Sequence, residues 1–235
     1  MSRTWLIAWS ACLWLVAAAA AAQDATIPEN WEGLVEVTPK HLDALALMPG
    51  ADFRPYRKLM LDPATAAFRK DWMKTVNRAG LAQRITQEDA EKIAGSARES
   101  FAEVFTEAFR AAGYEIVAAP GADVLRIRAG IIDLYIAAPD TEASGRTRTY
   151  TVEAGEATLF LEARDSTSGA LLGRALDQRK TRNTGRLMVT NQATNVANFR
   201  ALFRQWADIV VAGLENLREI SPVPQDLRPG QKLAP

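Results

Sequence analysis

The sequence predicts an α+β fold, a two-layer sandwich in which two long amphipathic helices cover one face of a mainly antiparallel sheet built as a meander. Three observations predict it. Apolar residues spaced by three and four form one stripe after Thr86 and a second stripe near the C-terminal end. Between the stripes, residues 124–180 alternate apolar and polar side chains, as strands do. The separation of strands from helices favours α+β over alternating α/β units.

The composition describes an ordinary globular chain of one domain or a tight pair. The chain has 235 residues, of which 48% are hydrophobic, and its 28 basic side chains balance its 28 acidic ones. This balance argues against nucleic-acid binding driven by bulk charge. The chain has one cysteine, Cys12, and one histidine, His41. These counts exclude an intrachain disulfide framework and a cysteine-rich zinc site, and they argue against a histidine-pair metal centre.

The N-terminal residues 1–22 have the three-part pattern of a secretory signal peptide. Arg3 supplies the positive charge, an uncharged apolar run follows, and the run ends in small alanines that suit a signal peptidase. We expect cleavage between Ala22 and Gln23. The mature protein is then periplasmic, with outer-membrane association left open.

Two alternatives to simple cleavage remain open. The first alternative is that the signal segment stays uncleaved as a membrane anchor, since its apolar run approaches the ~20 residues that a membrane-spanning helix needs. Cys12 follows Trp9-Ser10-Ala11, which faintly resembles the lipoprotein acceptor box, although the longer apolar stretch lies after the cysteine. Membrane contact is expected only if the signal stays uncleaved or Cys12 is lipidated.

The mature chain is predicted to begin with an extended arm over residues 23–55, which prolines interrupt repeatedly. A single α+β domain over residues 56–219 follows. Its first elements are a strand over 56–62 and, over 64–77, a strand that leads into a short helix.

A long helix is predicted to begin after Thr86 and to end at Gly113. Its first turn holds Glu88 and Asp89, where the helix dipole favours anions. A last helix over 191–219 carries the second apolar stripe. The proline-rich tail, residues 220–235, is predicted to be disordered.

Four strands are predicted between the helices: 114–117, 124–137, 147–164 and 171–180. The strand over 124–137 changes its apolar phase at Gly130, which predicts a β-bulge there. The run Asp165-Ser166-Thr167-Ser168-Gly169 predicts the hairpin turn between the last two strands.

Several runs between Trp31 and Leu217 together carry a family resemblance. They are Asp52-Phe53-Arg54-Pro55-Tyr56, Ala67-Phe68-Arg69-Lys70-Asp71-Trp72, Gly121-Ala122-Asp123-Val124-Leu125, Ile131-Ile132-Asp133-Leu134, Ala138-Pro139-Asp140, Gly155-Glu156-Ala157-Thr158-Leu159-Phe160-Leu161-Glu162, Asp165-Ser166-Thr167-Ser168-Gly169 and Arg204-Gln205-Trp206-Ala207. With these runs the sequence resembles the bacterial domain-of-unknown-function 3313 family. The resemblance implies an exported, often lipid-anchored envelope protein of Gram-negative type. The family has no established activity, so no catalytic residue is carried over, and this sequence departs from members with a clear lipidation box.

Charged side chains on the predicted strands offer one candidate constellation. On the predicted strand over 147–164, three charged side chains lie on one side: Glu156, Glu162 and Arg164. Across the hairpin, Arg174 is expected opposite Glu162. Arg126 and Arg128 join this constellation if the strand over 124–137 is a neighbour. The favoured interpretation is a ladder of cross-strand ion pairs on a solvated face. The alternative is a carboxylate pair for acid/base chemistry.

Asp133, set among Ile131, Ile132 and Leu134, is a second candidate. A buried carboxylate with a raised pKa would be a functional residue, but at a bulge it is expected to bond backbone amides instead.

A cluster of basic residues is predicted to lie in a polar loop and to form an anion-binding or interaction surface, or else a solvated loop. The cluster consists of Arg179, Lys180, Arg182 and Arg186, with Arg146 and Arg148 on another loop. A serine triad with Ser166 or Ser168 would need His41 as its base, far away in the chain. The sequence therefore predicts no catalytic residue, no metal ligand and no cofactor.

Three functional hypotheses follow. The first is a non-enzymatic interaction or structural component of the bacterial cell envelope, whose partner is an envelope protein or lipid and not a nucleic acid. The second is a small-ligand or lipid-binding module with a cleft between helices and sheet. The third, most distant hypothesis is a carboxylate-dependent hydrolase.

Overall fold

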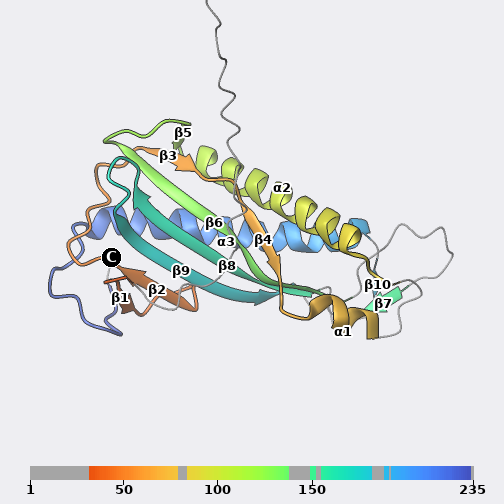
Figure 1. Ribbon diagram of the computed structural model, residues 1–235. Coiled ribbons are helices and arrows are strands. Elements are labelled where there is room, and N and C mark those ends of the chain that lie inside the picture. Colours follow the sequence, from red (N-terminus) through yellow and green to blue (C-terminus); the bar gives the residue numbers. More distant parts are fainter. Residues whose placement is uncertain are drawn as a thin grey trace, which may run out of the picture.

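The larger of two β-sheets forms the centre of the computed structural model, which describes residues 32–78, 84–137, 149–151, 155–181, 188–190 and 192–233. Its eight strands follow the order β1-β2-β9-β8-β6-β3-β5, and β4 also pairs with β6 (Figure 1). The strands are β1 (Val35–Val37), β2 (Ala44–Leu47), β3 (Lys58–Leu61), β4 (Thr65–Phe68), β5 (Glu115–Ile116), β6 (Val124–Ile136), β8 (Gly155–Asp165) and β9 (Leu171–Lys180).

Three helices and a second, two-stranded sheet complete the described residues. The helices are α1 (Trp72–Arg78), α2 (Gln87–Ala111) and α3 (Gln192–Ile220), and the small sheet pairs β7 (Thr149–Thr151) with β10 (Met188–Thr190). Figure 1 shows α2 and α3 extending along the length of the large sheet, with α1 and the small sheet near one of its ends.

The α+β class is confirmed, but the prediction of a mainly antiparallel meander is wrong, because the sheet is mixed. Strands β6, β8 and β9 are antiparallel neighbours, whereas β3 and β4 lie parallel to β6, and β5 lies parallel to β3. Parallel strands need a long crossover connection. Here α1 and α2 lie in the chain between β4 and β5, so they provide that crossover. The pattern within single segments did not reveal this non-local pairing.

Helix α2 begins where its capping residues predict. The Thr86 hydroxyl accepts from the Asp89 backbone N–H at 3.2 Å, and the Asp89 carboxylate accepts from the Thr86 backbone N–H at 2.9 Å. This reciprocal capping box satisfies two backbone donors that a helix end leaves free. It fixes the start of the helix that lies against the core.

Both α2 and α3 contribute apolar side chains to the same core as β6 and β8. Phe101 of α2 meets Phe203 of α3 edge to face, with ring centroids 5.4 Å apart. Against them lie side chains from one face of the two strands: Leu125, Ile127, Ala129 and Ile131 from β6, with Ala157, Leu159, Leu161 and Ala163 from β8. The sheet therefore has a helix-covered face and an opposite face.

The bulge in β6 lies three residues beyond the predicted position. The register with β8 shifts between Ile132 and Tyr135, and Asp133 has a φ of 51°. Gly130 stays in register, and a β-carbon there would lie 2.7 Å from the backbone oxygen of Thr65. The glycine therefore permits the close approach of β4, and Asp133 makes the change of phase.

The predicted arm and tail are ordered parts of the fold in their described residues. From the arm, β1 and β2 pair antiparallel, and β2 pairs with β9. From the tail, Val223 is buried and exchanges backbone hydrogen bonds with Gly50 at 2.9 Å and Ala51 at 2.8 Å. The expectation of a disordered tail is wrong for residues 221–233, and the predicted extended arm contributes two strands to the sheet within residues 32–55, because scattered apolar side chains dock between the prolines.

The predicted hairpin after β8 is confirmed, whereas the predicted strand over 147–164 is two strands. Its first part, β7, pairs with β10, and its second part, β8, pairs with β6 and β9. In the turn, one Asp165 carboxylate oxygen accepts from the backbone N–H groups of Thr167 and Ser168 at 3.1 and 2.7 Å. Gly169 supplies the positive φ of 72° that closes the turn.

Asp177 of β9 is a buried carboxylate on the helix-covered side of the sheet. It accepts from the Trp206 indole N–H of α3 at 2.7 Å and from the Asp43 backbone N–H at 3.1 Å, and it also contacts the Arg179 guanidinium. The Asp43 carboxylate in turn accepts from the Gln178 backbone N–H at 2.7 Å. These contacts connect β9 to α3 and to the residue that precedes β2.

We predict that Asp177→Ala lowers the free energy of unfolding by about 3–5 kcal/mol, because it leaves the buried Trp206 indole N–H without an acceptor and removes the carboxylate that pairs with Arg179. Urea denaturation measures the change. Asp208→Ala, which removes an exposed carboxylate from α3, is the matched control and should change stability by less than about 0.5 kcal/mol. Equal effects of the two variants would contradict the role given to Asp177.

The β8–β9 turn predicts a pH dependence. Hydrogen bonds from the Ser168 backbone and hydroxyl hold the pKa of Asp165 below its usual value, and the Tyr56 hydroxyl adds a further donor at 3.0 Å. Because the folded pKa lies below the unfolded value of about 3.9, the ionised carboxylate stabilises the fold above roughly pH 5. That stabilisation is lost as the pH falls through the folded pKa.

We therefore predict that Asp165→Asn lowers stability at pH 7 by about 1 kcal/mol and that its difference from the wild type shrinks below about pH 4. Urea midpoints measured from pH 3 to pH 7 provide the check. A difference that stays constant over this range would show that the charge of Asp165 contributes nothing.

Candidate functional site

A line of charged residues crosses the sheet on the face opposite the helices. Arg128 of β6, Glu162 of β8 and Arg174 of β9 stand directly opposite one another in the strand register. Arg174 donates two hydrogen bonds to Glu162 Oε1, from Nε at 2.8 Å and from a terminal nitrogen at 2.5 Å. Only 2% of the Arg174 side chain and 3% of the Glu162 side chain are exposed. The centre of the line is thus a buried ion pair.

Further charges surround this pair. Arg164 and Arg128 approach Glu162 Oε2 at 3.6 and 3.9 Å, and Glu32 approaches Arg174 at 3.3 Å. Within the described part of the chain, Glu162 Oε2 is buried and has no hydrogen-bond donor. The guanidinium groups of Arg128, Arg164 and Arg174 therefore surround the Glu162 carboxylate, and the Glu32 carboxylate lies beside Arg174.

The predicted cross-strand pairs are confirmed for Glu162, but the prediction that this face is solvated is wrong at its centre. Ala46 stands opposite Arg174 and shares its side of the sheet. Ala46 packs with Leu34 and Leu171 in a second, smaller apolar cluster. Residues from the predicted arm thus add apolar surface beside the pair, which sequence periodicity did not indicate.

Two predicted members of the ladder have other partners. Glu156 pairs with Arg69, which follows β4, and Arg126 pairs with Asp62 at 2.8 Å. Strands β3 and β4, which precede these partners in the chain, both lie beside β6. The ladder therefore extends across the parallel part of the sheet as well as across the hairpin.

Asp133 lies at the bulge, as its position among apolar residues suggested, and is half-buried. The structure shows no hydrogen bond from a backbone amide to its carboxylate among the described residues. Asp133 has a positive φ of 51°, so this residue provides the left-handed backbone conformation of the bulge.

The predicted basic surface is described only in part. The Arg179 guanidinium contacts Asp177 and donates to the His41 carbonyl oxygen at 2.8 Å. Lys180 is exposed at the end of β9 and also has an interaction partner. Arg182 and Arg186, like Arg146 and Arg148, lie outside the described residues. An anion-binding role for this surface stays a prediction.

The serines considered as nucleophiles hold the β8–β9 turn in place. The Ser166 hydroxyl accepts from the Gly121 backbone N–H and donates to the Gly121 carbonyl, both at 3.0 Å. The Ser168 hydroxyl donates to Asp165 at 2.7 Å. His41 is exposed near β2. Among the described residues, no group of three side chains is arranged to hold a metal ion, and no helix has the length and apolarity to span a membrane.

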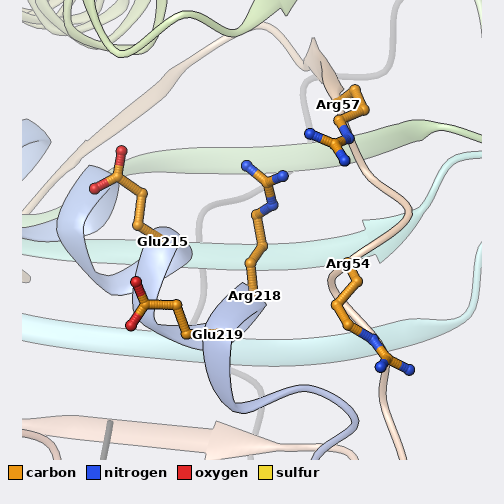
Figure 2. A pocket seen from close by; sticks show the side chains of 5 residues that line it. All are labelled: Arg54, Arg57, Glu215, Arg218 and Glu219. Carbon is orange, nitrogen blue, oxygen red and sulfur yellow. The ribbon is translucent and has the colours of Figure 1, made fainter.

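A recess of 510 Å³ lies between the C-terminal end of α3 and the segment that leads into β3. Five charged side chains line it: Arg54, Arg57, Glu215, Arg218 and Glu219. Figure 2 shows the guanidinium groups of Arg57 and Arg218 extending toward one another, while Glu215 and Glu219 point to the other side of Arg218. Arg54 points away from the others and pairs with Asp52 at 2.7 Å.

Sequence analysis did not find this recess. Its arginines come from opposite ends of the domain, so no spacing rule connects them. Arg54 stands within a run that carries the family resemblance, and Arg218 occupies the last turn of α3, where a cation suits the helix dipole. Neither signal indicates that the two segments meet.

The fold and its charged residues together define a two-layer α+β domain whose sheet carries a buried ion-pair line. A family model, described as a protein of unknown function (DUF3313), matches residues 23–210. The chain therefore belongs to this family, which confirms the resemblance found in the sequence. Among curated proteins, none matches the chain.

Several solved structures resemble the chain at low identity. The PelC dodecamer from Paraburkholderia phytofirmans is 12% identical, with a TM-score of 0.34 over 71% of this chain and 95% of that one. A DUF330 protein from Xanthomonas campestris is 13% identical, with a TM-score of 0.35 over 79% and 94%. A putative neuraminyllactose-binding hemagglutinin homolog from Helicobacter pylori is 9% identical, with a TM-score of 0.35 over 74% and 95%.

The buried pair yields a test by a double-mutant cycle. We predict that Glu162→Gln and Arg174→Met each lower the free energy of unfolding by about 3–5 kcal/mol, because each leaves the partner charge buried and uncompensated. The double variant should be less destabilised than the sum of the two, by at least about 1 kcal/mol. Additive losses in urea denaturation would mean that the two side chains do not stabilise each other.

Proposed function

We propose that this protein is an exported, non-enzymatic interaction or structural component of the bacterial cell envelope. One observation carries the proposal: the two glutamates that the sequence offers as a carboxylate pair for acid/base chemistry are each engaged with an arginine from another segment. Glu162 accepts two hydrogen bonds from Arg174, and Glu156 pairs with Arg69. These contacts give the carboxylates a part in holding the sheet together.

The geometry of the pairs favours a structural role over catalysis. A general acid or base must reach a proton of the substrate within about 2.6–3.2 Å. Glu162 is 2% exposed and lies beneath guanidinium groups, so a substrate has no approach to its carboxylate. Asp177 is 3% exposed and faces Trp206. The same side chains that would be needed for chemistry connect strands and helices.

Two further observations support export. The first is the signal pattern that ends at Ala22. The second is the family match, which starts at residue 23, directly after the expected cleavage point. A domain shared among family members and preceded by a removable leader would give this boundary.

A second candidate function is a small-ligand or lipid-binding module. The recess beside α3 favours it, because arginine side chains from two distant segments meet there around an open volume of the size of a ligand pocket. The two candidates are compatible, since an envelope component can recognise its partner through a bound group.

We predict that the protein produced in a Gram-negative host is recovered from the periplasmic fraction with Gln23 as its first residue. Intact-mass measurement and N-terminal peptide mapping provide the check, and a chain that lacks residues 1–22 should stay in the cytosol. A cytosolic protein that retains Met1 to Ala22 would contradict export. A lipid-modified Cys12 at the N-terminus would replace cleavage at Ala22 with anchoring.

The non-enzymatic role is tested by single substitutions. Variants with Glu156, Glu162, Asp133 or Asp165 changed to the amide should retain any cellular phenotype of the protein to the extent that they stay folded, as circular dichroism reports. Complete loss of the phenotype in a variant with wild-type stability would favour the hydrolase instead.

A further inference from the structure

Two arginine side chains in the recess have no acidic partner among the described residues. Arg57 is exposed on the segment before β3, and Arg218 is half-buried in the last turn of α3. The Nε atom of Arg218 is buried and has no hydrogen-bond acceptor within the described part of the chain. In Figure 2 the two guanidinium groups extend toward one another across the recess.

This arrangement is unfavourable in the absence of an anion. A buried N–H without an acceptor loses its hydration and gains nothing in return, which is why such groups are rare in folded proteins. Arg57 and Arg218 are two cations that line one recess, so they repel one another, and an anion placed between them converts this repulsion into two attractions. The binding of a negatively charged group between Arg57 and Arg218 relieves this repulsion and pairs the terminal nitrogens of both guanidinium groups.

We propose that this recess binds a phosphate ester, with the phosphate group held between Arg57 and Arg218. The proposal rests on the second candidate function, ligand binding, and names the chemical class of the ligand. It does not require export to be correct, because the binding site is a property of the folded chain alone.

The choice of phosphate follows from the direction of the two donors. A carboxylate has two oxygens in one plane, which match the fork of a single guanidinium. A phosphate monoester has three terminal oxygens arranged around phosphorus, so it accepts hydrogen bonds from two guanidinium groups on different sides. Two arginines from separate segments therefore suit a phosphate better than a carboxylate.

The rest of the recess indicates what accompanies the phosphate. Its volume of 510 Å³ leaves room for a substituent, and Glu215 and Glu219 line the side away from Arg57. Their carboxylates accept hydrogen bonds from hydroxyl or ammonium groups. Soluble sugar and glycerol phosphates are phosphate monoesters with such a polar substituent, and phosphatidic acid is a lipid whose headgroup is a phosphate monoester.

Arg54 provides a matched control. It lines the same recess, but two of its three guanidinium nitrogens, Nε and Nη2, donate to the Asp52 carboxylate at 2.9 and 2.7 Å. The same pairing holds the pKa of Asp52 below its usual value. Arg54 is therefore already paired with a carboxylate and points away from Arg57 and Arg218, so it is not expected to hold the phosphate.

The test measures binding of glycerol 3-phosphate to the full protein purified from the producing cells, by ³¹P NMR titration and calorimetry. Arg57→Gln and Arg218→Gln should each weaken the affinity about tenfold or more, because each removes charged hydrogen bonds to the phosphate. Arg54→Gln should change it less than about twofold. Thermal unfolding without ligand establishes that each variant is folded. If Arg218→Gln does not fold, the exposed Arg57 decides the outcome.

Two comparisons complete the experiment. Acetate should bind at least about tenfold more weakly than glycerol 3-phosphate, because its planar carboxylate engages one fork. In a second arm, vesicles that contain phosphatidic acid, a lipid whose headgroup is a phosphate monoester, are sedimented with the protein. Vesicle binding that glycerol 3-phosphate competes away, and that Arg57→Gln abolishes, identifies a lipid headgroup as the source of the phosphate. Soluble binding without vesicle binding identifies a free phosphate ester.

Three results would overturn the proposal. The first is a folded wild-type protein that binds neither the soluble ester nor the vesicles. The second is binding that Arg57→Gln and Arg218→Gln leave unchanged, or that Arg54→Gln weakens equally. The third is equal affinity for acetate. None of these results bears on where the protein is located, so failure of this site is distinct from failure of the envelope role.

Discussion

The register of β6, β8 and β9 is the constraint on which the rest of the structure depends. A side chain in a strand changes face with each step, so a slip of one residue would exchange the two faces of the sheet. In the observed register, Leu159 and Leu161 meet the helices while Glu162 meets Arg174 on the other side. A slip would place the Glu162 carboxylate against apolar side chains, and burial of an unpaired charge is far more unfavourable than the loss of a few contacts. The ion pair and the apolar core therefore specify the same alignment.

Other segments extend this central alignment in both directions. Asp177 connects β9 to Trp206 of α3 and to Asp43 at the start of β2, so the position of the last helix depends on the strand register. Residues 221–233 then return from α3 to the edge of the sheet, where Gln231 forms a backbone bridge to Val37. The C-terminal segment thus lies beside β1, the edge strand of the sheet (Figure 1). The recess lies where the C-terminal end of α3 passes the segment before β3.

Local signals in the sequence were sufficient to predict the elements that local interactions stabilise. The capping box at Thr86, the Asp165 turn and the alternation along β9 predict α2, the hairpin and its second strand with nearly correct boundaries. The position of the bulge required knowledge of a neighbour, because Gly130 serves the approach of Thr65 and not a change of phase. The parallel pairing of β3 and β4 with β6 likewise depends on a crossover that no single segment encodes.

The candidate sites show the same division between local and distant information. The pairing of Glu162 with Arg174 follows from strand alternation and hairpin length, so the sequence predicts it. The burial of that pair depends on Leu34 and Ala46 from a proline-rich segment, and the recess depends on Arg57 and Arg218 from opposite ends of the domain. Side chains that come together from distant segments produce no periodic pattern in the sequence. Groups of side chains of this kind become visible only when the fold is known.

The central claim is that the buried ion pair of Glu162 and Arg174, on the sheet face opposite the helices, stabilises the register of β8 and β9. Amide hydrogen exchange of Glu162→Gln, compared with the wild type under native conditions, tests it most directly. Our account predicts that protection falls along both β8 and β9, on either side of the hairpin, while the amides within α2 exchange at nearly wild-type rates. Unchanged protection in both strands would contradict it, because the buried carboxylate would then have no part in holding them together.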